Sequence, residues 1–416
     1  MRRAMGIRVR FNPGAVLIII LFALTLVSCL VLAVTTAATW VLCRSASGLP
    51  LGTRPISVLK PVQGLDDELE ENLASFCRQN HPQFELVIGA ADPSDPALAV
   101  ARRVQARFPH VEVRVVTGEW SNGLNPKVRN LRNLMQWARY PAVLVSDGDV
   151  RARPDYLRVL AGAIEQPGVG LVSNLVVGVG ERTLGSMCDN LQLNTFVAGN
   201  VAAADVIAKH PIVVGKSMLF HRDSLVNIGG FAAAADILAE DYFLGRAVSE
   251  AGYRVVTLGY PVQSVNRSRS LPCMLRRHLR WSQIRRQVAP GIFALEPLAH
   301  PTFWATLLLS VIIRDAWAST AGSTGLIAAL LLMLLLVALE SLAYAVLLER
   351  AMRLQHLLCL PLRSALVMLA WFGAWATDVV VWRGHAFRIG RGSRLTPLVH
   401  SRLRTRPERA GVSVAV

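Results

Sequence analysis

Long stretches without a charged residue predict where this chain meets a membrane. Residues 15–43 carry no charge, and these 29 residues exceed the roughly 20 that a helix needs to cross the hydrocarbon of a bilayer. We predict an uncleaved anchor here, because the stretch is too long for the core of a secretory signal. Two more spans are predicted at 325–348 and 364–382, whereas the 13-residue stretch 301–313 suits an interfacial or re-entrant segment.

Between these stretches, residues 50–290 alternate strand-like and helical patterns. Short apolar runs at 56–62, 84–91 and 142–146, and a run at 111–117 that alternates with period two, are separated by helical patterns. Strands separated by helices of this length predict βαβ units and a mostly parallel sheet. We therefore predict a Rossmann-like α/β domain joined to transmembrane α-helices. Ligands of such sheets bind at the carboxyl ends of the strands, so candidate chemistry is expected where the apolar runs end.

Composition and charge support a membrane protein. Of the 416 residues, 53% are hydrophobic and only 17% are charged, against about a quarter charged in an ordinary soluble domain. The net charge of +16 lies largely in arginine clusters beside the apolar stretches. Anionic headgroups and the positive-inside bias favour such clusters, so we expect a bilayer and no nucleic acid as partner. The six cysteines form no CxxC pair, which argues against a zinc site or a disulfide framework.

The arginine clusters give conflicting orientations. Four arginines before the first span place the N-terminus in the cytoplasm and the central domain outside, whereas the basic tail places itself and the domain inside. We favour the second orientation, because the donor substrate inferred from the motifs is made in the cytosol. The predicted domains are a basic segment and anchor (1–48), a cytosolic catalytic domain (49–290), a membrane region of two to three spans (291–382) and a basic cytosolic tail (383–416).

Two of the apolar runs end on acidic residues. The run at 84–91 leads into Asp92 and Asp95, and the fourth run leads into Asp147-Gly-Asp149. Two carboxylates separated by one small residue at a strand end can chelate a hard divalent cation, Mg²⁺ or Mn²⁺, which would bridge a diphosphate. Asp-Gly is also common turn chemistry, so the alternative is a solvated turn.

Two later motifs carry charge. Glu240 and Asp241 open a helical stretch, where an acid is also a common N-terminal cap. Arg277, Arg280 and Trp281 lie in a basic helical stretch before the membrane, where the alternative is an interfacial helix anchored by its tryptophan. Each motif has an ordinary structural explanation when it is taken alone.

Other candidate motifs fail. Gly215-Lys216-Ser217 is similar to the end of a P-loop, but that motif requires a glycine where His210 stands. The nine histidines show no HxxxH spacing, so none is predicted to bind metal. Glu340 and Asp378, which lie in predicted spans, are interpreted as structural.

The order of the acidic and basic motifs resembles that of GT-A family 2-like glycosyltransferases. Residues 58–66 (VLKPVQGLD), 125–127 (NPK), 239–243 (AEDYF) and 382–384 (WRG) resemble the ceramide glucosyltransferase family more closely, including its bacterial hopanoid-biosynthesis members. The resemblance covers residues 55–290 and extends loosely to Leu395. It implies a GT-A domain and a bacterial inner membrane, with the catalytic domain facing the cytoplasm.

The resemblance also implies roles for donor-binding residues. Asp95, or Asp92, would hold the uridine of a UDP-sugar. Asp147 would bind the ribose or the metal, and Asp149 the metal itself. Lys127 lies in a segment that would face the diphosphate.

For the transfer step, the resemblance implies that Asp241 is the general base of a single inverting displacement at the anomeric carbon. Arg277, Arg280 and Trp281 would line the junction between donor and acceptor and stabilise the departing diphosphate. The expected reaction moves one sugar, glucose favoured, from a UDP-sugar to a lipid hydroxyl, most readily that of ceramide. The alternatives are UDP-N-acetylglucosamine transfer to a hopanoid, a processive polysaccharide synthase, and a non-catalytic membrane scaffold.

Overall fold

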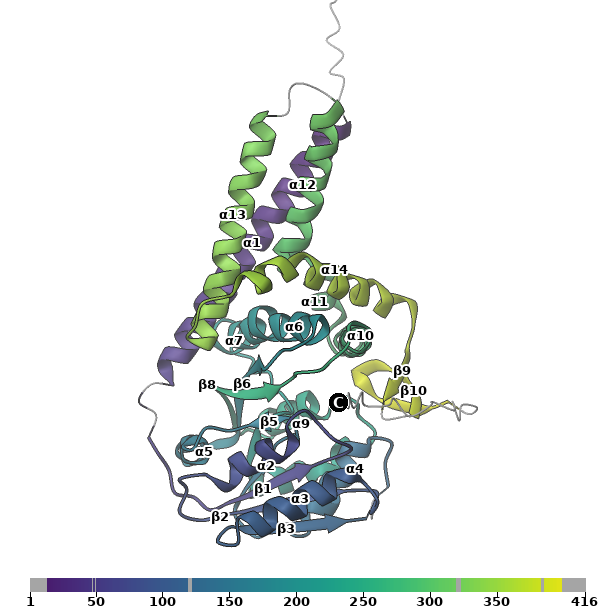
Figure 1. Ribbon diagram of the computed structural model, residues 1–416. Coiled ribbons are helices and arrows are strands. Elements are labelled where there is room, and N and C mark those ends of the chain that lie inside the picture. The colour runs from purple at the N-terminus through teal and green to yellow at the C-terminus, as the bar shows by residue number, and fades with distance from the viewer. Residues whose placement is uncertain are drawn as a thin grey trace, which may run out of the picture.

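Three apolar helices stand side by side above the rest of the protein (Figure 1). The computed structural model describes residues 13–46, 48, 50–118, 122–318, 323–382 and 385–398. The bundle consists of α1 (Pro13–Ser45), α12 (Pro301–Ala318) and α13 (Ser323–Leu348). Apolar side chains from all three helices form its core. By length and hydropathy, α1 and α13 can each cross a membrane, which agrees with the predictions at 15–43 and 325–348.

Two predicted membrane segments do not form single straight spans in the structure. The stretch 301–313 is part of the 18-residue helix α12, which packs along α1 and α13 and meets the preceding helical segment at a bend of 53°, as a broken span or a re-entrant segment would. The span predicted at 364–382 is divided between a helix and a strand. Helix α14 (Leu354–Ala376) lies across the base of the bundle (Figure 1), and strand β9 (Val379–Trp382) follows it.

The central domain contains an eight-stranded sheet in the order β3-β2-β1-β4-β7-β6-β8-β5. The four predicted apolar runs form the first four strands of this order, and neighbours among them are parallel. The antiparallel pairings of β7 with β4 and β6, and of β5 with β8, make the sheet mixed. The strands are β1 (Ile56–Pro61), β2 (Phe84–Ala90), β3 (Glu112–Thr117), β4 (Ala142–Val145), β5 (Val150–Arg151), β6 (Val169–Val179), β7 (Met218–His221) and β8 (Arg254–Val265).

Both faces of the parallel part of the sheet are covered by helices. Along β1, Val58 belongs to one hydrophobic core and its neighbour Leu59 to the other, because successive side chains of a strand point to opposite faces. Burial on both faces explains why β1, β2 and β4 are mostly apolar runs, whereas the edge strand β3 alternates. The helices of this half are α2 (Leu69–Cys77), α3 (Pro96–Arg107), α4 (Pro126–Met135) and α5 (Tyr156–Ile164).

The second half of the domain lies between the sheet and the membrane bundle (Figure 1). Its membrane-proximal layer contains α6 (Leu184–Leu191), a π-helical turn (Gln192–Val197), α7 (Ala198–Val206), α10 (Leu271–Val288) and α11 (Pro290–Leu295). Helices α8 (Arg222–Asn227) and α9 (Glu240–Glu250) belong to the domain below. The end of α1 approaches β8 so closely that a Cβ on Gly259 would lie 2.0 Å from the carbonyl oxygen of Leu42. A glycine is therefore required where the anchor meets the sheet.

A small antiparallel sheet follows α14. Strands β9, β10 (His385–Ile389) and β11 (Leu395–Pro397) pair in sequence order. Leu395 donates its backbone N–H to the carbonyl of Asp236 at 2.7 Å, which fixes the sheet to the loop that precedes α9. The region predicted as a tail from residue 383 therefore contributes residues 385–397 to the folded protein. The predicted architecture, an α/β domain joined to apolar helices that are long enough to cross a membrane, is confirmed, and its sheet is mixed.

Candidate active site

The loops after β1 and β2 are joined by a carboxylate. Asp95 caps α3 by accepting a hydrogen bond from the N–H of Ala97, and both its oxygens lie 2.9 Å from the N–H of Gly64. Asp92 is exposed and accepts hydrogen bonds from Ser94. Of the two acids predicted to hold the uridine, Asp95 is therefore the one built into the edge of the sheet. Its contact with a nucleotide remains a prediction.

The Asp147-Gly-Asp149 motif lies at the carboxyl end of β4 and is paired with two lysines. Lys127 Nζ lies 2.8 Å from Asp147 Oδ1, and Lys216 Nζ lies 2.5 Å from Asp149 Oδ2. Lys216 is also 3.8 Å from Asp147 Oδ2. The two carboxylates thus converge on one cation, which here is an ammonium group of the protein itself.

This convergence tests whether the motif suits a divalent metal. Carboxylate oxygens are the ligands that Mg²⁺ and Mn²⁺ prefer, and two of them already face a common positive charge. Among the described residues, no group of three or more His, Cys, Asp or Glu side chains is arranged as a metal site. Asp147 and Asp149 supply two ligands of the right chemistry, and a divalent ion between them, which stays a prediction, requires that Lys216 moves aside.

A third lysine holds the backbone of the motif. Lys60, at the end of β1, is fully buried and donates to Ser146 Oγ at 3.0 Å and to the carbonyl of Asp147 at 2.9 Å. Its ammonium group lies 3.5 Å from the centre of the Phe76 ring. Burial lowers the pKa of Lys60 to about 7, although the nearby aspartates act in the opposite direction. The motif is thus anchored by Lys60, which lies in the 58–66 segment that carries the family resemblance but to which the sequence analysis gave no role.

Lys127 links the Asp147-Gly-Asp149 motif, called the metal motif below, to the Glu240-Asp241 pair. It is the second residue of α4, and Asn125 caps that helix by accepting from the N–H of Val128. Besides Asp147, Lys127 contacts Glu240 Oε1 at 3.0 Å and the carbonyl of Gly215 at 3.1 Å. Burial alone would lower the pKa of Lys127, but the charges of Asp147 and Glu240 raise it above its usual value. We conclude that Lys127 stays protonated.

Asp241 has the properties of a general base. Asp241 Oδ2 accepts a hydrogen bond from the N–H of Gly215 at 2.8 Å, and Asp241 Oδ1 accepts one from the N–H of Tyr242, also at 2.8 Å. Burial and the adjacent charge of Glu240 raise the pKa of Asp241 to about 6, although Lys127 opposes them. Asp241 is partly exposed, whereas Glu240 is buried against Lys127. Asp241 is therefore the more accessible acid of the pair, and its role as the general base stays a prediction.

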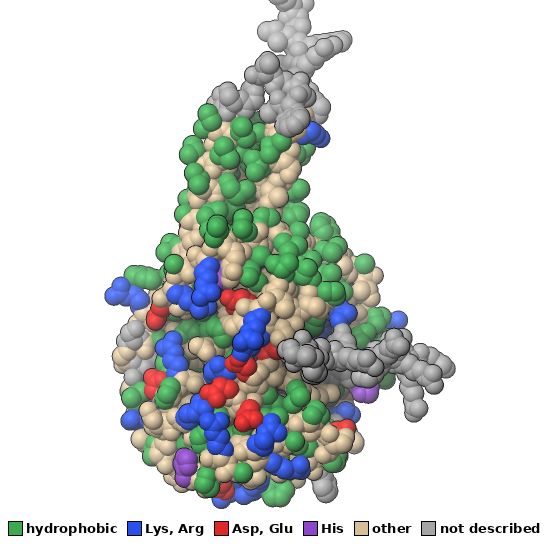
Figure 2. Space-filling model, viewed as in Figure 1, with side chains coloured by type: hydrophobic (Ala, Val, Ile, Leu, Met, Phe, Trp, Pro, Cys, Tyr) green, Lys and Arg blue, Asp and Glu red, His purple; other side chains and the backbone are tan. Residues whose placement is uncertain are grey.

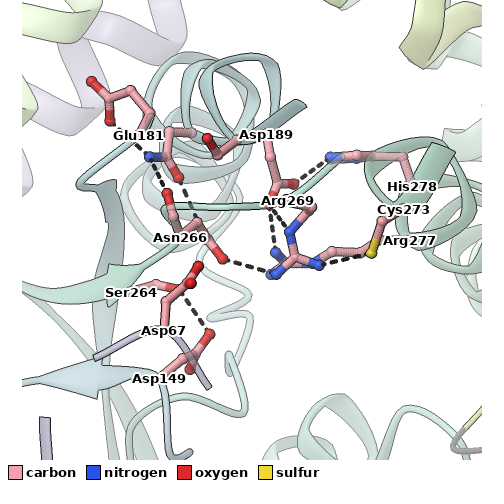
Figure 3. Close-up of polar contacts among 12 residues, drawn as sticks. Asp67, Asp149, Glu181, Asp189, Ser264, Asn266, Arg269, Cys273, Arg277 and His278 are labelled. Atoms are coloured by element: carbon pink, nitrogen blue, oxygen red, sulfur yellow. Dashed lines mark hydrogen bonds and ion pairs between the residues drawn. The ribbon is translucent and has the colours of Figure 1, made fainter. Parts of the chain in front are cut away.

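Of the two arginines predicted to line the donor–acceptor junction, Arg277 is instead paired with a buried aspartate (Figure 3). Arg277 is buried and donates to Asp189 Oδ2 at 2.6 Å, and its guanidinium stacks 4.3 Å from the centre of the Trp281 ring. His278 Nε2 lies 2.8 Å from the other oxygen of Asp189. Burial would raise the pKa of Asp189, but Arg277 and His278 hold it well below its usual range. The pair fixes α10 to α6. Arg280 and Trp281 are partly exposed on the same helix.

Figure 3 also shows polar residues extending from the metal motif toward α6. Ser264 Oγ donates to Asp149 Oδ2 at 3.1 Å. Two residues further along the chain, Asn266 accepts from Arg269 at 2.9 Å and donates to Asn190 at 3.0 Å. The end of β8 thus carries hydrogen-bonding groups toward both the metal motif and the buried Asp189 pair.

The C-terminal sheet holds the residue before the Glu240-Asp241 pair. Ser393 is buried with φ of 59°, a conformation that residues other than glycine rarely adopt. Its carbonyl accepts from the N–H of Leu238 at 2.9 Å, and its Oγ accepts from that of Ala239 at 3.1 Å. Ala239 is the N-cap of α9 and supplies no side-chain cap of its own. Ser393 therefore fixes the turn from which Asp241 projects, and no motif in the sequence indicates this contact.

Taken together, the site is a membrane-anchored cluster of acids and lysines at the carboxyl edge of an α/β sheet. The model of the family described as "Glycosyl transferase family 21" matches residues 20–395, and the chain belongs to this family. The predicted glycosyltransferase class and the resemblance to ceramide glucosyltransferases are thereby confirmed.

Relatives agree with this family. Ceramide glucosyltransferase 3 from Caenorhabditis elegans is 28% identical over 249 residues, covering 58% of this chain and 53% of that protein. Ceramide glucosyltransferase from Komagataella phaffii is 26% identical over 312 residues, covering 61% of each. The matched part of the chain thus spans between half and three-fifths of these relatives. Among solved structures, a mannosyltransferase from Pyrobaculum calidifontis in complex with GDP-Man and Mn²⁺ aligns with a TM-score of 0.46 at 19% identity, covering 85% of this chain and 99% of that one.

Proposed function

We propose that this protein is an inverting glycosyltransferase that moves one sugar from a UDP-sugar, glucose favoured, to the hydroxyl of a membrane lipid, most readily ceramide. The observation that carries the proposal is the position of Asp241. It is a partly exposed carboxylate whose pKa is raised to about 6, and it lies close to Lys127, which pairs with Asp147. The family and its ceramide-transferring relatives support the choice of substrates.

The proposed reaction is a single displacement. Asp241 accepts the proton of the acceptor hydroxyl, whose oxygen forms a bond to the anomeric carbon as the bond from that carbon to the diphosphate breaks. The bonding electrons leave with UDP, and attack from the opposite face inverts the configuration. Lys127 and Lys216 lie beside Asp147 and Asp149, where their charges would stabilise the diphosphate as it departs.

A divalent ion, Mg²⁺ or Mn²⁺, would be held by Asp147 and Asp149. When bound, it supplies positive charge that neutralises the diphosphate. Lys216 occupies the shared position between these carboxylates, so we propose that its ammonium group turns from Asp149 to the donor phosphates when the ion binds. Arg280 and Trp281 remain the proposed contacts at the donor–acceptor junction. Arg277 acts through them, because its own charge is taken up by Asp189.

The proposed setting is a bacterial inner membrane with the catalytic domain facing the cytoplasm, where nucleotide sugars are made. The three-helix bundle supports the membrane assignment. The site lies in the domain on which the bundle stands, so a lipid hydroxyl at the bilayer surface can serve as acceptor (Figure 1).

The experiment is a matrix of donors and acceptors with the full-length protein in lipid vesicles. Radiolabelled UDP-glucose and UDP-N-acetylglucosamine are each supplied with ceramide, a hopanoid or no acceptor, and Asp241→Asn is the matched inactive variant. We expect one β-linked glucose on ceramide. A single N-acetylglucosamine on the hopanoid would support the alternative acceptor, a polymer would indicate a synthase, and no transfer to any lipid would refute the proposal.

A further inference from the structure

Helix α14 is long and apolar enough to cross a membrane, but both of its ends lie beside the catalytic domain. At its start, His356 Nε2 lies 3.0 Å from Glu181, which follows β6 in the domain. At its end, the chain enters the C-terminal sheet, where Leu395 bonds the carbonyl of Asp236 at 2.7 Å. A helix that crossed the bilayer would place its two ends on opposite sides of the hydrocarbon, about 30 Å apart along the membrane normal, so both could not contact a domain that lies on one side. We infer that α14 does not cross.

One face of α14 is fixed to the protein by polar contacts and small residues. Arg363 is only 2% exposed, lies 2.5 Å from Glu340 of α13 and donates to Thr195 at 2.9 Å. Further along the same face, Ala370 and Ala374 are buried in the packing of α14 with the rest of the protein. This face explains why a helix of mostly apolar composition stays against the domain.

The other face is an exposed apolar stripe. Leu358 is 72% exposed and Phe372 is 58% exposed, and they lie on one side of the helix with the similarly exposed Leu354, Leu369 and Trp375. A run of large apolar side chains at this level of exposure is unusual on a surface that faces water. Figure 2 shows that the hydrophobic surface of the bundle continues downward to this level of the molecule.

We propose that α14 lies within the bilayer leaflet that faces the catalytic domain, with its stripe among the lipid acyl chains. Helix α11 extends this surface, because Ile292 is exposed and the Trp371 indole donates to the carbonyl of Phe293 at 2.9 Å. Tryptophans at the end of such a surface suit the headgroup level. We call the exposed faces of α14 and α11 the lipid shelf.

The lipid shelf adjoins the candidate active site through α10. The Arg286 guanidinium lies 5.8 Å from the centre of the Trp375 ring, and Gln283 donates to the backbone carbonyls of Thr377 and Val379 at 3.0 Å. The same helix carries Trp281, two residues before Gln283. If the proposed function holds, a lipid acceptor whose chains rest on the shelf has its polar end beside α10, so the shelf is the route by which the acceptor reaches the site.

The position of α14 is tested by measuring the depth of spin labels. The full-length protein, with its six native cysteines replaced, is reconstituted in phosphatidylcholine–phosphatidylglycerol vesicles, and one label is placed at Leu354, Ala365 or Trp375. Oxygen and a water-soluble nickel complex then report the depth of each label. A label at Leu331 of α13 serves as the deep control and one at Val226 of α8 as the aqueous control, because both side chains are exposed.

We expect the three α14 labels to report one similar depth, shallower than that at Leu331. A label at Ala365 as deep as that at Leu331, with shallow labels at both ends, would mean that α14 crosses the bilayer and would overturn the inference. This result does not depend on the reaction, so it stands apart from any failure of the proposed function.

The delivery role is tested with charges on the stripe. In a double variant, Leu358→Glu and Leu369→Glu, we expect the rate with vesicle-borne ceramide to fall at least tenfold relative to the rate with a short-chain ceramide dispersed in detergent. Val226→Glu places one such charge on an exposed apolar position outside the shelf and should leave that ratio unchanged. Equal ratios in all three proteins would refute the delivery role while leaving the depth result intact.

Discussion

Removing the charge of Lys127 should move the pH dependence of transfer to higher pH. Lys127 contacts Asp147 and Glu240 directly. Its Nζ and Asp241 Oδ2 each lie 3.0 Å from the point where a Cβ on Gly215 would stand, so they are at most twice that distance apart. Lys127→Met keeps the length of the side chain and removes a charge that favours ionised Asp241.

The size of the shift follows from this geometry. At a separation of about 6 Å and an effective dielectric constant of about 20, two unit charges interact by about 3 kcal/mol, which corresponds to about two pKa units. The pKa of Asp241 is about 6 in the intact protein. A base must be ionised to accept a proton, so activity rises with pH through this pKa. In Lys127→Met, the acidic limb should therefore move upward by one to about two pH units.

The assay is the pH dependence of kcat/KM between pH 5 and 9 for the wild type, Lys127→Met and Lys127→Arg. We expect the arginine variant, which keeps the charge, to retain an acidic limb near that of the wild type. If Lys127→Met is slower at every pH but its limb does not move, then Lys127 acts on the donor alone, and the electrostatic link to Asp241 is wrong.

Three further predictions concern the surrounding contacts. EDTA should abolish transfer, and full activity in the chelator would refute the metal assignment. Lys216→Met should bind Mn²⁺ about tenfold more tightly, as measured by electron paramagnetic resonance, because the ammonium group that competes for Asp149 is gone. Ser393→Ala leaves a buried N–H without its acceptor, at about 1 kcal/mol, so kcat should fall about fivefold with unchanged calorimetric donor affinity; an unchanged kcat would remove Ser393 from the positioning of Asp241. Asp189→Asn leaves Arg277 buried without its counter-charge and should lower the melting temperature in detergent by several degrees, whereas no change would show that the pair is not structural.

Much of the fold could be predicted from the sequence because its strands are buried on both faces. The runs that become β1, β2 and β4 are mostly apolar for that reason, and the acids that follow β2 and β4 mark the carboxyl edge of the sheet. The placement of α14 could not be predicted in this way. Its composition satisfies the length and hydropathy of a span, and only its tertiary contacts, such as Arg363 with Glu340, hold it across the base of the bundle.

The same limit applies to the site. Asp147, Asp149 and Asp241 are recognisable because each stands in a short local motif. Lys216 lies in a segment tested only as a P-loop, and its role depends on the pairing of β4 with β7, which brings its loop beside the metal motif. Ser393 is 154 residues from Ala239, whose N–H it accepts, and α12, α13 and α14 lie between them in the chain. Such contacts arise from long-range packing and leave no local pattern.

The central claim is that Asp241, and not Glu240, removes the acceptor proton. The direct measurement compares kcat for Asp241→Asn and Glu240→Gln, with UDP-sugar binding measured in parallel by calorimetry. Asp241→Asn keeps the volume and loses the proton acceptor, so kcat should fall by at least about a hundredfold with donor affinity almost unchanged, and Glu240→Gln should be milder. Near-normal turnover in Asp241→Asn together with a large loss in Glu240→Gln would exchange the two roles, and full activity in both variants would contradict the account.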